Sequence, residues 1–206
     1  IDPCEPHGVA LKQIAKYLLK TRTMGMIIKP TKDLTLDCYS DADFAGCFKR
    51  HDPNNPKSVK SRSGFVITLG NVPVSWHSKL QSETALSTME SKYFSLSQAM
   101  RVLLPMRLLL SEISPPLRLQ RDPKSIFKST IWEDNAACLS LATSDPPRMT
   151  PRSKSIAVKY HWFRKHLIKG VIEVKSIGTL DQMADIFTKA TPQPTFERLC
   201  LMLLRW

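Results

Sequence analysis

The spacing of apolar residues predicts a helix followed by three strands in the first part of the chain. A repeat close to 3.6 residues over 7–20 is typical of an amphipathic helix, with its apolar positions at Val9, Leu11, Ile14, Leu18 and Leu19. Runs over 34–40, 64–69 and 72–77 have the composition of strands, and the Gly70-Asn71 pair between the last two is typical of a tight turn. We therefore expect an antiparallel hairpin that belongs to a three-stranded meander.

The remainder of the chain alternates between helical and strand-like patterns. We expect a long helix from Glu90 to about 113, which Pro105 kinks or splits and Pro115 ends. The further elements expected are a strand over 129–133, a helix over 135–142, a helix over 157–169 that ends at Gly170, a strand over 171–177 and a helix over 181–189. This order predicts an α/β fold with a mixed five-stranded sheet flanked by helices.

The domain organisation follows from where the patterns pause. The length of 206 residues suits one domain with an appendage. The chain begins with Ile1 rather than Met, so we expect a segment of a longer polypeptide, with 1–30 belonging to a preceding domain, 31–191 forming the main domain and 192–206 forming an amphipathic tail. No apolar run reaches the ~18 residues that a membrane span needs.

The charge balance points to a polyanionic partner. The chain has 30 Lys and Arg against 18 Asp and Glu, a formal net charge of +12. Such a balance favours nucleic acid over a membrane surface, and an ordinary solvated surface is the weaker alternative. The five cysteines are an odd number without a CxxC spacing, which indicates free thiols rather than a disulfide framework or a structural zinc.

Four acids fall at the expected boundaries of elements: Asp41, Glu90, Asp134 and Asp185. In a mixed sheet of this order the first and fourth strands are neighbours, so these side chains can converge. Clustered carboxylates repel one another unless cations neutralise them, and hard oxygen ligands select Mg²⁺ or Mn²⁺. Two such ions form the clamp of in-line phosphoryl displacement. Taken singly, each acid has another explanation as a turn residue, a helix cap or a partner of a helix dipole.

Several motifs, in this order, resemble the ribonuclease H domain of copia-type LTR retrotransposon polyproteins. They are 40–46 (SDADFAG), 61–65 (SRSGF), 74–79 (VSWHSK), 85–90 (ALSTME), 133–137 (EDNAA), 159–164 (KYHWFR) and 182–189 (QMADIFTK). The similarity runs from about residue 34 to 190, and residues 1–30 resemble the end of the reverse transcriptase that precedes this domain in such polyproteins.

The resemblance implies a ribonuclease H-like fold and metal-dependent hydrolysis of the RNA strand of RNA–DNA hybrids. It implies two Mg²⁺ or Mn²⁺ ions on Asp41, Glu90, Asp134 and Asp185, and it favours Asp41 over Asp43, which we expect to serve the turn. The implied partners are an RNA–DNA hybrid and the reverse transcriptase domain of the same polyprotein, in a retrotransposon particle.

Two departures from the family pattern lead to an alternative. The family has Glu-Ala-Glu-Tyr where this chain has Glu90, Ser91, Lys92 and Tyr93, and it has Lys-His-Ile where this chain has Ser155 in place of the His. If the second acid of the first motif is the metal ligand, Lys92 places a cation in the site. The alternative function is therefore a catalytically inactive ribonuclease H-like module that binds nucleic acid. An integrase-like nuclease is disfavoured, because a late Asp…Glu pair is missing.

Contacts to a hybrid are expected mainly from cations that meet phosphates. The candidates lie in two basic loops and near strand ends: Arg62, Ser63, Lys79, Arg152, Lys154 and Lys189. His161 is a candidate proton shuttle, with a structural role as the alternative.

Overall fold

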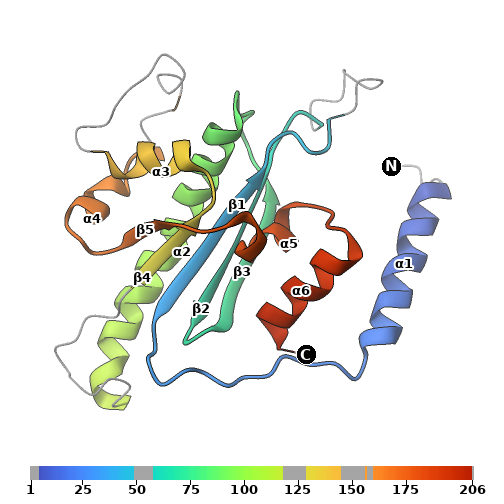
Figure 1. Ribbon diagram of the computed structural model, residues 1–206, viewed down its shortest axis with the longest axis horizontal. Helices are drawn as coiled ribbons and strands as arrows, with labels where there is room; N and C mark the ends of the chain where they lie inside the picture. Colours follow the sequence, from blue (N-terminus) through green and yellow to red (C-terminus); the bar gives the residue numbers. More distant parts are fainter. Residues whose placement is uncertain (1–4, 49–57, 118–128, 145–155, 157–159, 206) are drawn as a thin grey trace.

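The computed structural model describes residues 5–48, 58–117, 129–144, 156 and 160–205. Within them, five strands form one mixed sheet in the order β3-β2-β1-β4-β5 (Figure 1). The strands β1 (Leu36–Asp43), β2 (Arg62–Leu69) and β3 (Val72–Leu80) form the predicted antiparallel meander. The strands β4 (Ser129–Glu133) and β5 (Glu173–Ser176) extend the sheet in parallel to β1. The predicted α/β class and the adjacency of the first and fourth strands are confirmed.

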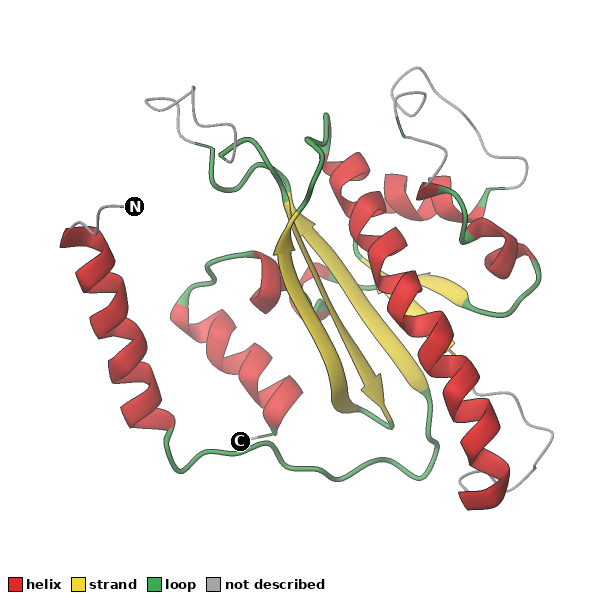
Figure 2. Ribbon diagram, turned by 180° about the vertical axis from the view of Figure 1, so that it is seen from behind, coloured by secondary structure: helices red, strands yellow, loops and turns green. Residues whose placement is uncertain are grey.

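Helices cover both faces of the sheet. The long helix α2 (Thr88–Leu117) packs on one face together with α3 (Ala136–Thr143) and α4 (Arg164–Ile168) (Figure 2). The other face carries the 3₁₀ turn η2 (Thr179–Asp181) and the helices α5 (Asp185–Thr188) and α6 (Gln193–Leu204) (Figure 1). None of the helices among the described residues is long and apolar enough to cross a membrane.

Burial on both faces explains the continuous apolar run of β2. Phe65 and Ile67 join the larger core under α2, whereas Val66 points to the other face and packs with Met183 and Leu203. The tail predicted for 192–206 is therefore part of the body of the domain, since α6 supplies Leu203 to this second core. Side chains that alternate between two covered faces are what hold the sheet between its helices.

Two predicted helix boundaries were wrong. The helix α2 continues as one element past Pro105 and through Pro115 to Leu117. A proline removes one backbone hydrogen bond, but Leu103 and Leu110, on either side of Pro105, are both buried, and this packing holds the helix together. The segment expected as one helix over 181–189 is divided into η2 and α5. Gln182 lies between them, and its side chain is fully buried.

The first helix stands at the edge of the molecule. It is α1 (Glu5–Thr21), none of its residues is buried, and it lies beside α6 (Figures 1 and 2). The rings of Tyr17 and Phe196 meet edge to face with their centroids 6.0 Å apart. This position agrees with an appendage, and the assignment of 1–30 to a preceding domain stays a prediction.

The helix predicted over 157–169 is also shorter in the structure. Its described part is helical only in α4, and residues 157–159 lie outside the described residues. Gly170 adopts a positive φ of 65°, as expected of a residue that terminates a helix.

Candidate functional site

Three of the four predicted acids meet at one edge of the sheet. Asp41 lies in β1, Asp134 directly follows β4, and Asp185 is the first residue of α5. One carboxylate oxygen of each lies within 4.8 Å of those of the other two. Asp41 is not beyond the strand, as the sequence suggested, but inside it and opposite Gly64 of β2. The parallel pairing of β1 with β4 is what brings the first two side chains together.

Lys92, near the start of α2, extends its ammonium group into this cluster. Its Nζ lies 2.5 Å from Oδ1 of Asp41 and also donates a hydrogen bond to Oδ1 of Asp134. Oε1 of Glu133 lies 4.0 Å from the same nitrogen. The Lys92 side chain is only 8% exposed, so this ammonium is held between two strands rather than in solvent.

The second oxygen of Asp41 is also occupied. Thr188 donates its hydroxyl to Oδ2 over 2.5 Å, and Nζ of Lys189 lies 3.2 Å from the same oxygen. Lys189 also pairs with Oδ1 of Asp185 at 2.7 Å. Both carboxylate oxygens of Asp41, which is fully buried, are thus engaged by groups of the chain itself.

Glu90 lies outside the cluster. Its carboxylate accepts a hydrogen bond from the backbone N–H of Leu86 at 2.7 Å, and its own N–H donates to the Ser87 hydroxyl at 3.1 Å. These contacts cap the N-terminus of α2. Residues two apart on a helix point about 200° away from each other, so a helix that turns Lys92 toward the aspartates turns Glu90 away. The structure therefore corrects the expected placement of Glu90, and position 92 is the one that extends from α2 into the site.

The donor set does not fit a divalent metal ion. Such an ion needs free carboxylate oxygens at about 2.0–2.2 Å. Here Lys92 takes one oxygen of Asp41 and one of Asp134, and Thr188 and Lys189 take the other oxygen of Asp41. A divalent cation at the same place would also meet the positive charge of Lys92. The three aspartates have the composition of a metal site, but an ammonium group stands in its centre.

The electrostatics of the cluster follow from burial and from the two lysines. Burial would raise the pKa of Asp41, but Lys92 and Lys189 outweigh it and hold that pKa at about 2. Burial would lower the pKa of Lys92, and Asp41 and Glu133 instead raise it above its ordinary value. Both groups therefore stay charged at neutral pH. For Asp185, burial is the main cause of a raised pKa.

Glu133, the last residue of β4, behaves differently from its neighbours. It is fully buried, and burial raises its pKa to about 8 against an ordinary value of 4.5. Lys92 lies within ion-pair range at 4.0 Å and acts in the opposite direction, but Asp41 and Asp134 take its hydrogen bonds. We therefore describe Glu133 as a neutral carboxyl group at pH 7.

This raised pKa makes a prediction about the pH dependence of stability. The unfolded chain releases the Glu133 proton near 4.5 and the folded chain near 8, so the folded state loses stability as the pH rises through this window. Glu133→Gln keeps the oxygen that accepts from the Asn135 N–H at 3.0 Å and removes the titration. We expect the variant to gain stability relative to the parent between pH 5 and 9, by about 3 kcal/mol. Urea unfolding at a series of pH values measures this difference.

The matched control for that prediction is Glu173→Gln. Glu173 pairs with Lys175 at the surface, where both side chains are more than half exposed. An exposed pair is worth little, so the control is expected to follow the parent at every pH. A parallel course of the Glu133→Gln and parent curves from pH 5 to 9 would contradict the raised pKa.

The predicted contacts to nucleic acid have different outcomes. Lys79 is exposed on the edge strand β3, and Arg62 at the start of β2 donates to the Ser78 hydroxyl at 3.4 Å. Ser63 is wrong as a contact, because it is fully buried and accepts a hydrogen bond from the Gln81 amide at 2.9 Å. Lys189 is engaged by Asp41 and Asp185.

Three other predicted residues can be stated briefly. Arg152 and Lys154 lie outside the described residues. His161 packs against Tyr93, whose hydroxyl lies 2.9 Å from Nδ1 of the imidazole. This contact agrees with the structural alternative that the sequence left open.

Two residues that hold the site were missed as site residues. Thr188 donates to Asp41, and the buried amide of Gln182 donates to the backbone oxygens of Ser40 and Trp132 at 3.1 and 3.3 Å. Gln182 thereby fastens the segment that carries Asp185 to the ends of β1 and β4. The signal was present, since both residues belong to the motif over 182–189, but the acid and the lysine drew the functional interpretation.

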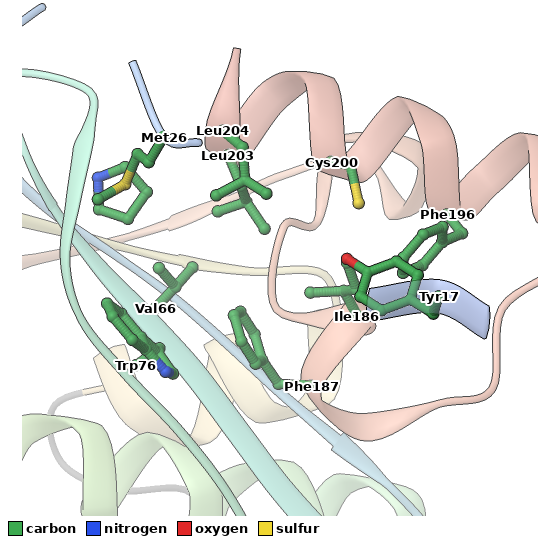
Figure 3. Close-up of a pocket in the computed structure, with 11 residues that line it drawn as sticks. Tyr17, Met26, Val66, Trp76, Ile186, Phe187, Phe196, Cys200, Leu203 and Leu204 are labelled. Atoms are coloured by element: carbon green, nitrogen blue, oxygen red, sulfur yellow. The ribbon is translucent and has the colours of Figure 1, made fainter. Parts of the chain in front are cut away.

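Beside the second core lies an apolar pocket of about 330 Å³ (Figure 3). Trp76 and Phe187 form one side of it, and Phe196 and Leu203 of α6 line it together with Tyr17 of α1. The cluster of aspartates is not part of its lining. Trp76 is 61% exposed, which agrees with its expected role as an aromatic residue of a surface or interface.

Comparison with known proteins places the chain among transposon polyproteins. It is 33% identical over 195 residues to the retrovirus-related Pol polyprotein from transposon RE1 of Arabidopsis thaliana, and 31% identical over 195 residues to that from transposon RE2. It is 30% identical over 203 residues to the Pol polyprotein from transposon TNT 1-94 of Nicotiana tabacum. These matches cover 95–98% of the chain but only 12–14% of each polyprotein. No family model matches the chain.

Comparison with solved structures identifies the fold. LC11-RNase H1, isolated from compost, superposes with a TM-score of 0.50 at 16% sequence identity, over 75% of this chain and 92% of the other. At this identity the similarity concerns the fold alone. The predicted ribonuclease H-like fold is confirmed.

Proposed function

We propose that this chain, a ribonuclease H-like domain of a retrovirus-related Pol polyprotein, binds RNA–DNA hybrids and does not hydrolyse them through bound metal ions. The observation that carries the proposal is the ammonium group of Lys92, which contacts Asp41 and Asp134 where a metal ion would stand. The chain thus keeps the fold and its surface, while its acid cluster is closed by its own lysine.

The charge of the chain supports a hybrid as the ligand. A net charge of +12 favours a polyanion, and much of the affinity for nucleic acid comes from phosphate contacts. Lys79 is exposed on the edge strand β3. Its register partner is Ser63 of β2, two residues from the partner of Asp41, so the exposed lysine lies near the sheet edge that carries the cluster. A hybrid lying on this edge would meet Lys79 first.

A second candidate function is hydrolysis of the RNA strand, with Mg²⁺ or Mn²⁺ as cofactor. The observation in its favour is the convergence of Asp41, Asp134 and Asp185. For this function Lys92 would have to withdraw from both of the aspartates that it contacts. We place it second because the Lys92 ammonium and its carboxylate partners are all largely buried.

The test measures binding and cleavage on the same hybrid. We expect the chain to bind a labelled RNA–DNA hybrid in EDTA, with an affinity that falls about 100-fold or more between 50 and 200 mM salt. We expect no cleavage beyond that of an Asp134→Asn variant when Mg²⁺ or Mn²⁺ is added. Cleavage that depends on the metal and is lost in Asp134→Asn would establish the second candidate instead.

A matched pair of lysine variants locates the binding surface. Lys79→Gln is expected to weaken hybrid binding and to reduce the slope of log affinity against log salt by about one. Lys12→Gln, on the exposed helix α1, removes the same charge far along the chain and is expected to bind as the parent does. Equal loss in both variants would mean that general charge, and not this surface, carries the binding.

A further inference from the structure

We infer that Lys92 is a built-in cation of the acid cluster, and that the single change Lys92→Glu turns the cluster into a binding site for Mg²⁺ or Mn²⁺. This inference deepens the proposed function, since it rests on the same lysine that the proposal uses. It does not depend on hybrid binding, and its test contains no nucleic acid.

The charges of the cluster require a cation at this place. Asp41, Asp134 and Asp185 lie within one small volume, and the described ammonium groups in contact with them are those of Lys92 and Lys189. Lys92 is the group that joins the aspartates of two strands, because it contacts both Asp41 and Asp134. Removing it leaves the Asp41–Asp134 pair without a shared counter-ion. Like charges brought together at low exposure are costly unless another cation replaces the lost one.

The geometry around Lys92 leaves room for that replacement. A glutamate side chain is shorter than a lysine side chain by about one bond, so its carboxylate would stop short of the present position of Nζ. The vacated volume would be faced by Oδ1 of Asp41 and Oδ1 of Asp134, which now contact Nζ, and by the new carboxylate. Three carboxylates around one small volume are the hard oxygen ligands that Mg²⁺ and Mn²⁺ prefer.

A second observation at the same place points to a cation. Glu133 is fully buried, and its Oε2 has no hydrogen-bond partner among the described residues. Its other oxygen lies 4.0 Å from Nζ of Lys92. A buried carboxyl group with a free oxygen, close to the ammonium, is a further acceptor at the centre of the cluster. The parent chain meets this demand with a lysine that no chelator can remove.

Thermal unfolding of the full chain in EDTA and in Mn²⁺ tests the inference. We expect the parent Tm to be the same in both conditions, because its cation is covalently part of the chain. We expect Lys92→Glu to have a lower Tm than the parent in EDTA and to rise by about 5 °C or more in Mn²⁺ at a hundred times its Kd. Adding Asp134→Asn to Lys92→Glu is expected to remove most of this rise.

Two results would overturn the inference: a parent that gains as much from Mn²⁺ as Lys92→Glu, or a folded Lys92→Glu with no gain. If Lys92→Glu does not fold in EDTA, Lys92→Met gives the second measurement. It removes the cation without adding a carboxylate, so we expect a smaller rise in Mn²⁺ than for the glutamate variant but a larger one than for the parent. A Met variant that ignores Mn²⁺, beside a glutamate variant that stays unfolded in Mn²⁺, would also overturn it. Loss of hybrid binding in the parent would overturn the proposed function and leave this result untouched.

Discussion

Asp41→Ala is expected to lower the free energy of unfolding by about 3–5 kcal/mol, because it strips a buried ion pair of its central carboxylate. Asp41 is fully buried and receives Lys92 on one oxygen, with Thr188 and Lys189 on the other. Without it, the ammonium of Lys92 keeps Asp134 as its hydrogen-bonded partner and remains largely out of solvent. Urea unfolding at pH 7 measures the loss.

The control for this change lies on the same strand. Asp37 accepts from the Thr35 hydroxyl at 2.6 Å and from the Trp132 indole at 3.3 Å, both neutral donors. Asp37→Ala is therefore expected to cost only about 1 kcal/mol. In the double variant Asp41→Ala/Lys92→Met the unpaired cation is gone, so the loss should be smaller than for Asp41→Ala alone. Equal losses for Asp37→Ala and Asp41→Ala would contradict the special role of the cluster.

Most of the fold could be predicted because the hydrophobic pattern and the turn residues agree. Gly70 and Asn71, which join β2 to β3, both adopt positive φ, and the hairpin was placed from them alone. The adjacency of β1 and β4 followed from the order of the elements. The course of α2 past Pro105 could not be predicted, since it depends on Leu103 and Leu110 packing into a core that only the folded chain creates.

The site could be predicted only as far as strand ends determine it. Asp134 and Asp185 were found because they stand at the end of β4 and the start of α5. The choice between Glu90 and Lys92 depends on how α2 is rotated about its axis. That rotation is set by its buried residues such as Tyr93 and Leu96, and an error of two residues reverses the direction of a side chain. Ser63 failed as a predicted contact for a related reason, because β2 is buried on both faces.

The tightest approach around the site lies between β2 and α5, at Gly64. A Cβ atom at this position would stand 2.6 Å from Cγ2 of Thr188 and 2.9 Å from Cβ of Phe187. Gly64→Ala therefore pushes α5 away from the sheet, although Gly64 itself adopts an ordinary strand conformation opposite Asp41. We expect the change to destabilise the chain by about 1–3 kcal/mol, the usual cost of overpacking. Part of this loss comes from the Thr188 hydroxyl, whose 2.5 Å contact with Asp41 lengthens.

Two further variants separate this steric effect from a general intolerance of alanine. Gly25→Ala adds a Cβ that meets nothing within 4 Å, so we expect a change of no more than about 0.5 kcal/mol. Thr188→Ser removes the Cγ2 atom that stands closest to the added Cβ and keeps the hydroxyl that Asp41 accepts. The pair Gly64→Ala/Thr188→Ser should therefore recover part of the stability that Gly64→Ala loses, beyond the sum of the single changes. Strict additivity of the two changes would mean that α5 does not bear on β2 at Gly64, and that Thr188 reaches Asp41 without that contact.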